Sequence, residues 1–283
     1  MNIVGLGAPG CNIADKFTQY PQYNIYKIDV GLKGLKKNGI YAMPKQNSVE
    51  DYESNCPSLS NFFKNISGEV LFILCGAGEI SGATLRILET IRTCKISILY
   101  ILPDVELLSE LAQLRNNATF NILQQYARSG LFETIRIVHN PEIELLIGDV
   151  PIVGYYDRLN EVIASTVHMI NVYKNTKPVM STLTQPVDFA RISTIGTYDE
   201  EQKKENLLFL LDNVREVVYY YGIPSDLLKS DGNLLRSITK KVKEASKKGK
   251  IKTSFGIFST EYNQKYCFIE VHTAFIQNIK KTA

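Results

Sequence analysis

Short apolar segments alternate with amphipathic segments along the first half of the chain. Apolar runs rich in Val, Ile and Leu predict strands that are covered on both faces of a sheet. The predicted strands are residues 2–6, 23–30 (which alternates with period two), 69–75, 95–102 and 134–138. Segments with helical period lie at residues 12–20, 83–93, 105–130 and 156–173. This β-α-β order predicts an α/β fold built on a doubly wound, mostly parallel sheet.

The pattern changes after Pro178. Strand-like segments lie at residues 214–221, 252–259 and 266–276, and one helical segment lies at 233–248. This mixture indicates a smaller α+β unit. We therefore divide the chain into an α/β domain at residues 1–155, a central helix at 156–175 and a C-terminal α+β domain at 176–283.

The composition is that of an ordinary globular protein. Of the 283 residues, 45% are hydrophobic and 22% are charged, which excludes a disordered or low-complexity chain. No apolar stretch approaches the ~20 residues of a membrane span. The first residues lack the basic start and apolar run of a signal peptide. We expect a cytoplasmic protein without a membrane span.

The cysteines and histidines do not form the pattern of a metal site or a disulfide framework. The five cysteines are widely spaced without a C-x-x-C pair, and the three histidines stand far apart. Free thiols in a reducing compartment fit this spacing better. We expect no metal ligands among the side chains. The net charge of +3 does not by itself demand a nucleic-acid partner.

Two glycine-rich turns follow predicted strands. The first contains Gly5, Gly7 and Gly10, and its G-x-G-x-x-G spacing with Asp29 at the end of the next strand matches a dinucleotide-binding fingerprint. A tight turn without a ligand is the alternative. The second turn, residues 75–84, also leads into a predicted helix. Two helix N-termini at one sheet edge form an anion site that suits a triphosphate.

Six short motifs follow one another along the chain. They are residues 7–12 (GAPGCN), 76–82 (GAGEISG), 117–124 (NATFNILQ), 140–142 (NPE), 156–160 (YDRLN) and 186–191 (PVDFAR). In this order they resemble the two phosphate loops, the tubulin stretch N-A-T-L-S-V-H-Q, the base-reading segments and the catalytic loop of the tubulin/FtsZ superfamily. The short chain is most similar to divergent phage or plasmid tubulin relatives.

The resemblance implies a site for GTP or GDP, with Mg²⁺ bound alongside the nucleotide. The implied nucleotide-binding residues are Gly7, Ala8, Gly10, Cys11, Asn12, Gly76, Ala77, Gly78, Ser81, Gly82, Asn140, Tyr156 and Asn160. The glycines and Ser81 would hold phosphates, whereas the asparagines at 12, 140 and 160 and Tyr156 would contact the base. Asp188 would reach the active site of the next subunit, so the resemblance also implies a head-to-tail homopolymer.

Three departures from the family pattern concern this site. Glu79 and Ile80 replace a Thr-Gly pair in the second glycine turn, where a carboxylate would repel phosphate and a branched side chain would add bulk. Arg191 replaces the second acid of the catalytic loop, and a guanidinium cannot act as a general base. In the same loop, Pro186 replaces the usual asparagine. The third departure is the ribose carboxylate, for which Glu110 is a candidate although the spacing offers Leu114.

Three functional hypotheses follow. The first is a filament-forming GTP-binding protein with weak or absent hydrolysis, which leaves open whether the chain is an enzyme. The second is a structural or interaction protein of the same fold that has lost nucleotide binding. The third, from a different class, is an NAD-dependent oxidoreductase built on the first glycine turn.

A basic segment at residues 236–252 is open to two interpretations. Its cations are Arg236, Lys240, Lys241, Lys243, Lys247, Lys248, Lys250 and Lys252. They form either a solvated helix face or an electrostatic surface for an acidic partner.

Overall fold

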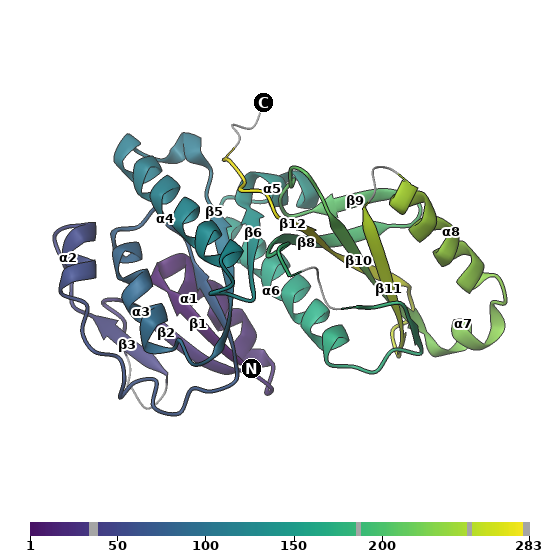
Figure 1. The fold of residues 1–283 in the computed structure, drawn as a ribbon, viewed down its shortest axis with the longest axis horizontal. Coiled ribbons are helices and arrows are strands. Elements are labelled where there is room, and N and C mark those ends of the chain that lie inside the picture. Colours follow the sequence, from purple (N-terminus) through teal and green to yellow (C-terminus); the bar gives the residue numbers. More distant parts are fainter. Residues whose placement is uncertain (34–38, 185–187, 248–250, 280–283) are drawn as a thin grey trace.

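The computed structural model describes residues 1–33, 39–184, 188–247 and 251–279. Within these residues, twelve strands form one sheet in the order β3-β2-β1-β4-β5-β6-β8-β12-β10-β11-β7, with β9 paired to β8. Figure 1 shows the sheet running through both halves of the molecule, with helix α6 between the halves. The predicted α/β fold with a mostly parallel sheet in its first half is confirmed.

The first half of the sheet is parallel throughout. Its strands are β1 (Asn2–Leu6), β2 (Asn24–Val30), β3 (Ile40–Met43), β4 (Glu69–Leu74), β5 (Lys95–Leu102) and β6 (Thr134–His139). Five of them match the predicted strands to within one residue at either end. The short strand β3 was not predicted. Because the strands are parallel, the loops that follow β1, β4, β5 and β6 all lie at one edge, which we call the carboxyl edge.

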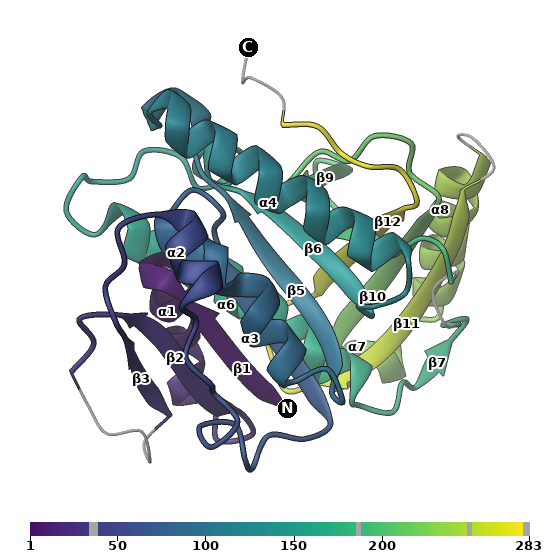
Figure 2. The same ribbon diagram turned by 60° about the vertical axis from the view of Figure 1, so that its left-hand side comes forward.

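Helices cover both faces of this half because successive strand residues point to opposite sides. Leu71 and Ile73 of β4 pack beneath α1 (Gly7–Lys16), α5 (Asn140–Ile147) and α6 (Tyr155–Lys174). Phe72 and Leu74 pack on the other face beneath three further helices. These are α2 (Val49–Ser54), α3 (Thr84–Thr90) and α4 (Glu110–Arg128), which Figure 2 shows in front of the sheet.

Helices α1 and α5 differ from the prediction near the glycine turns and the end of β6, and the short helices α2 and α7 (Ser225–Ser230) were not predicted either. Helix α1 begins at Gly7 rather than at residue 12, because the first glycine turn is itself the first turn of the helix. Gly7 has a φ of +70°, a conformation that only glycine adopts readily, and it turns the chain directly from β1 into α1. Helix α5 was not predicted, because Asn140-Pro141 suggested a turn. Proline fits the first turn of a helix, where its missing N–H has no partner to lose.

The second half continues the same sheet. Its elements are β7 (Met180–Ser181), β8 (Ile192–Asp199), β9 (Lys204–Leu207), β10 (Glu216–Pro224), α7 (Ser225–Ser230), α8 (Leu234–Lys247), β11 (Lys252–Thr260) and β12 (Tyr266–Thr273). Strand β8 pairs parallel with β6, and the hydrophobic core under α6 includes both Leu71 of β4 and Tyr220 of β10. The division into residues 1–155, 156–175 and 176–283 stays a prediction.

Helix α8 carries most of the basic segment. Its apolar side, with Leu234 and Ile238, packs on β10 and β11, whereas Arg236, Lys240 and Lys243 are exposed on the opposite side. Two cations of the segment have partners inside the molecule: the Lys241 ammonium lies over the Tyr198 ring, and Lys252 pairs with the buried carboxylate of Glu216 at 2.9 Å. Lys248 and Lys250 lie outside the described residues. No described helix is both long and apolar enough to cross a membrane.

Candidate functional site

The first glycine turn lets helix α1 approach the sheet very closely. A Cβ on Gly5 would lie 2.4 Å from the carbonyl oxygen of Gly10, and a Cβ on Gly10 would lie 2.3 Å from that of Ile73 in β4. Both distances are far inside van der Waals contact with backbone atoms that cannot move aside. Gly5 and Gly10 are therefore required for packing, while Gly7 and Ala8 lie directly after β1 at the carboxyl edge.

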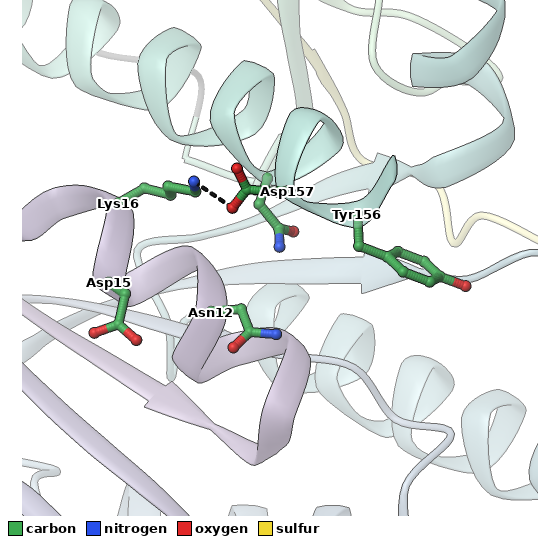
Figure 3. A pocket seen from close by; sticks show the side chains of 6 residues that line it. Asn12, Asp15, Lys16, Tyr156 and Asp157 are labelled. Atoms are coloured by element: carbon green, nitrogen blue, oxygen red, sulfur yellow. Dashed lines mark hydrogen bonds and ion pairs between the residues drawn. The ribbon is translucent and has the colours of Figure 1, made fainter. Parts of the chain in front are cut away.

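A pocket of about 380 Å³ lies between helices α1 and α6 at this edge (Figure 3). Its lining residues are Asn12, Asp15, Lys16, Tyr156, Asp157 and Asn160. Lys16 of α1 reaches across to Asp157 in the first turn of α6, with an Nζ–Oδ1 distance of 2.5 Å. Asp15 points away from α6 and pairs with Lys27 at 2.7 Å. The first ion pair connects α1 with α6, and the second connects α1 with β2.

The pocket combines amide groups with an aromatic ring. Asn12 and Asn160 each offer an acceptor oxygen and two N–H donors. The Tyr156 side chain is 60% exposed, and its ring extends away from the Lys16–Asp157 pair (Figure 3). An exposed aromatic ring beside amide donors and acceptors can bind a planar heterocycle by stacking and by hydrogen bonds to its edge.

The structure brings together some of the sequence-predicted residues and separates others. Asn12, Tyr156 and Asn160, from two distant segments, line the same pocket. Asn140 is the first residue of α5, at the end of β6, and is not one of the residues lining the pocket. The Cys11 thiol is buried and donates to the carbonyl oxygens of Gly5 and Ile28. Burial raises its pKa to about 12, so Cys11 can meet a ligand only through its backbone.

Three lining residues were missed in the sequence: Asp15, Lys16 and Asp157. Asp15 and Lys16 are three and four residues after Asn12, so they share its face of a helix. The signal was therefore present, but it required the knowledge that α1 already runs as a helix through residue 12. Asp157 is adjacent to the predicted Tyr156.

The second glycine turn is closed by the chain's own packing. It follows β4, and a Cβ on Gly76 would lie 2.1 Å from the Tyr100 hydroxyl oxygen. The Ser81 hydroxyl is buried and donates to the Gly76 carbonyl oxygen at 3.0 Å. A Cβ on Gly82 would lie 2.1 Å from the Val49 carbonyl oxygen in α2. Ser81 and Gly82 thus hold the turn and the neighbouring helix together, whereas Gly78 has open space around it.

Glu79 and Ile80 stand in this turn, as the sequence register predicts, at the start of a short 3₁₀ helix (Glu79–Ala83). The Ile80 side chain lies against Gly7, with its Cγ2 atom 3.1 Å from where a Gly7 Cβ would be. The Glu79 carboxylate pairs with Arg115 of α4 at 3.4 Å. Arg115 also donates from Nε to the Ala77 carbonyl oxygen at 3.2 Å. The negative charge that the sequence places in the turn is therefore balanced by a cation.

Arg115 was also missed in the sequence. The spacing of the motifs pointed to the preceding residue, Leu114, which the structure leaves 66% exposed on the outer side of α4. One residue along a helix turns the side chain by about 100°, so Arg115 faces the glycine turn instead. Glu110, the other candidate, is exposed in the first turn of α4.

The predicted catalytic loop lies at the opposite edge of the sheet. Asp188 precedes β8, and β8 runs parallel to β6, so the loop lies where β6 begins. Arg191 donates to the Phe132 and Glu133 carbonyl oxygens there, at 3.2 Å each. The side chain of Asp188 is exposed. Pro186 lies outside the described residues. Among the described residues, no group of three or more His, Cys, Asp or Glu side chains could hold a metal ion.

Solved structures with the same architecture cover almost the whole chain. FtsZ from M. jannaschii matches with a TM-score of 0.67 and 13% identity over 96% of this chain and 87% of that chain. TubZ of Bacillus thuringiensis serovar israelensis, in GDP-form protofilaments, matches with a TM-score of 0.70 and 15% identity over 95% and 88%. The chain has the tubulin/FtsZ fold.

A third structure with the tubulin/FtsZ fold, a GTPγS-bound protofilament of CetZ2 from Haloferax volcanii, matches with a TM-score of 0.65 and 11% identity over 96% of this chain and 92% of that chain. Neither protein-family models nor the sequences of curated proteins match the chain. The strand order β3-β2-β1-β4-β5-β6 of this chain is also that of dinucleotide-binding folds. The solved structures that match over almost the whole chain are those of FtsZ, TubZ and CetZ2, and the oxidoreductase hypothesis stays a prediction.

Proposed function

We propose that this protein assembles head to tail into filaments and binds a guanine nucleotide in the pocket between α1 and α6, with hydrolysis slow or absent. The observation that carries the proposal is the position of the pocket and of the Asp188 loop at opposite edges of one sheet. No single chain can bring the two together. A copy stacked on the next copy can do so, and the TubZ and CetZ2 structures with the same fold are protofilaments.

The surfaces around both edges suit such stacking. Ile152 and Val153, just before α6, are 95% and 93% exposed at the carboxyl edge. At the opposite edge, Phe189 beside Asp188 is 60% exposed. Exposed apolar side chains at two opposite ends of a molecule favour a heterologous contact, which propagates when its rotation does not close.

We assign the base half of the nucleotide to Asn12, Asn160 and Tyr156. The amides have the donors and acceptors to bind the edge of guanine, and Tyr156 supplies a stacking surface. The backbone of Gly7 and Ala8 would face the phosphates at the start of α1. Hydrolysis lacks a second acid, because Arg191 stays protonated and is bound to two carbonyl oxygens. Mg²⁺ would bind through the phosphates rather than through a cluster of acidic side chains.

The head-to-tail geometry predicts the behaviour of two charged variants. Phe189→Glu and Ile152→Glu are each expected to abolish sedimentation of filaments, because each places a carboxylate in one half of the apolar contact. Mixed in equal amounts, they should form dimers but no filaments, since each variant keeps one intact end. Analytical ultracentrifugation measures this, with Leu235→Glu on exposed α8 as the control. Filaments of normal length from either variant would place the contact elsewhere.

The assignment of the base pocket predicts a selective loss of affinity. Tyr156→Ala should weaken guanosine and GTP binding by about 1–3 kcal/mol, the usual contribution of stacking on an aromatic ring. Its thermal stability should stay unchanged because the side chain is mostly exposed. Isothermal titration calorimetry checks the affinity, with the 53% exposed Tyr262→Ala as the matched control. Equal affinities for wild type and Tyr156→Ala would contradict stacking on Tyr156.

Assembly without nucleotide is the second candidate function. It is favoured by the contact of Ile80 with Gly7, which narrows the space between the two glycine turns. Protein stripped of nucleotide and tested for filaments by electron microscopy separates the two candidates. The exposed basic side of α8 would in either case be the surface for an acidic partner.

A further inference from the structure

The Arg115 guanidinium is a cation placed directly on the second glycine turn. Its Nε donates to the Ala77 carbonyl oxygen, and its terminal nitrogen pairs with the Glu79 carboxylate. The arginine side chain is only 18% exposed, whereas the glutamate side chain is 46% exposed. The cation is therefore held by the fold on a 19-residue helix, and the anion is the freer partner of the two.

The Glu79 carboxylate binds Arg115 in the way that a phosphate group could. A guanidinium binds carboxylate and phosphate oxygens with the same planar set of N–H donors, and it has five of them. The contact with Glu79 is long for a charge-assisted hydrogen bond, at 3.4 Å. A half-exposed pair of this length is weak and easily exchanged.

Glu79 and Ile80 occupy consecutive positions of one 3₁₀ turn. While Glu79 pairs with Arg115, Ile80 lies against Gly7 of the first glycine turn. A ligand anion that takes the place of Glu79 on Arg115 would free only the Glu79 side chain, because Ser81 and Gly82 hold the backbone of the turn in place. The repulsion between Glu79 and a phosphate would then be relieved by the movement of one side chain.

We propose that Arg115 is a phosphate-binding residue of this protein and that Glu79 is an internal anion which a nucleotide phosphate must displace. The proposal rests on the nucleotide pocket of the proposed function. It makes Arg115 the side chain that distinguishes a phosphorylated nucleotide from its nucleoside. Glu79 sets the affinity for the phosphate part and leaves the base part unaffected.

The test compares four probes on the full chain by calorimetry: guanosine, GDP, GTP and inorganic tripolyphosphate. Glu79→Gln keeps the shape of the side chain and removes its charge, so it should bind GTP and tripolyphosphate about tenfold more tightly than wild type, with guanosine unchanged. Arg115→Gln should lose the preference for GTP over guanosine, and Arg115→Lys should restore part of it. The control is Glu89→Gln, which breaks an exposed pair with Arg86 in the neighbouring helix α3.

The outcomes separate this inference from the proposed function. One outcome is that Glu79→Gln binds guanosine but has the same ratio of GTP affinity to guanosine affinity as wild type. This outcome would contradict the role of Arg115 and Glu79 and would still support the base pocket. Tighter tripolyphosphate binding in Glu79→Gln without any guanosine binding would support Arg115 and contradict the guanine pocket. If neither wild type nor any variant bound any of the four probes, both the proposed nucleotide pocket and the proposed role of Arg115 would be wrong.

Discussion

Replacing Glu270 by glutamine is expected to lower the free energy of unfolding by about 3–5 kcal/mol, the typical cost of breaking a buried ion pair. The Glu270 side chain in β12 is 1% exposed. It pairs with Arg136 of β6 at 2.9 Å and with Lys174 in the last turn of α6 at 2.5 Å. Glutamine keeps the shape but has no charge, so two cations would be left beside a neutral group.

The Glu270 cluster matters because it joins the two halves of the molecule. Strand β6 belongs to the parallel half, β12 to the mixed half, and α6 lies against both. Urea denaturation at neutral pH measures the loss, and Glu161→Gln in the exposed Arg158–Glu161 pair is the control, with an expected change below about 0.5 kcal/mol. An equally small change in Glu270→Gln would show that water reaches the cluster.

The same carboxylate predicts how the stability difference depends on pH. Burial alone would raise the pKa of Glu270, but Lys174 and Arg136 outweigh burial and hold the pKa well below the ordinary value of 4.5. A carboxylate whose pKa is lowered by folding contributes stability above the pKa of the unfolded chain, and this contribution is lost as the pH falls through the folded pKa. The difference in the free energy of unfolding between wild type and Glu270→Gln should therefore be largest above about pH 4.5 and should decrease below it.

Gly10→Ala should lower the free energy of unfolding by at least about 3 kcal/mol or prevent folding. Overpacking usually destabilises a protein by about 1–3 kcal/mol, and a clash with backbone atoms lies at the upper end of this range. The added Cβ would lie 2.3 Å from the Ile73 carbonyl oxygen, and relief requires α1 to move off the sheet. Gly78→Ala is the matched control. Gly78 has a φ of −79° and no atom within 4 Å of the added Cβ, so the control should unfold at the wild-type temperature. Differential scanning calorimetry compares the two.

The Gly10 result also decides what the first glycine turn does. If Gly10→Ala folded with wild-type stability and lost only nucleotide affinity, the glycine would be needed for contact with phosphate instead of for the packing of α1. We expect instead that Gly10→Ala loses stability even in the absence of any ligand. This result would show that the G-x-G-x-x-G spacing is required for the packing of α1 on β1 and β4.

Much of the parallel half could be predicted from sequence, because buried parallel strands are continuous apolar runs. Residues 95–102, for example, are predicted as a strand and form β5 without any change of bounds. Helix α1 was placed too late because three of the four residues in its first turn, Gly-Ala-Pro-Gly, are glycine or proline, which have low helix propensity. In this case the packing of Gly5 against Gly10 outweighs propensity.

The sequence by itself determined the α/β fold, the motifs and the identity of Asn12, Tyr156 and Asn160 as candidates for one site. These depend on local periodicity and on spacing along the chain. Only the tertiary structure decided that Arg115 balances Glu79, that Cys11 faces the core and that Asp188 lies at the far edge from the pocket. The physical reason is that each depends on the direction of a side chain or strand relative to a partner distant in sequence, which the spacing of residues does not record.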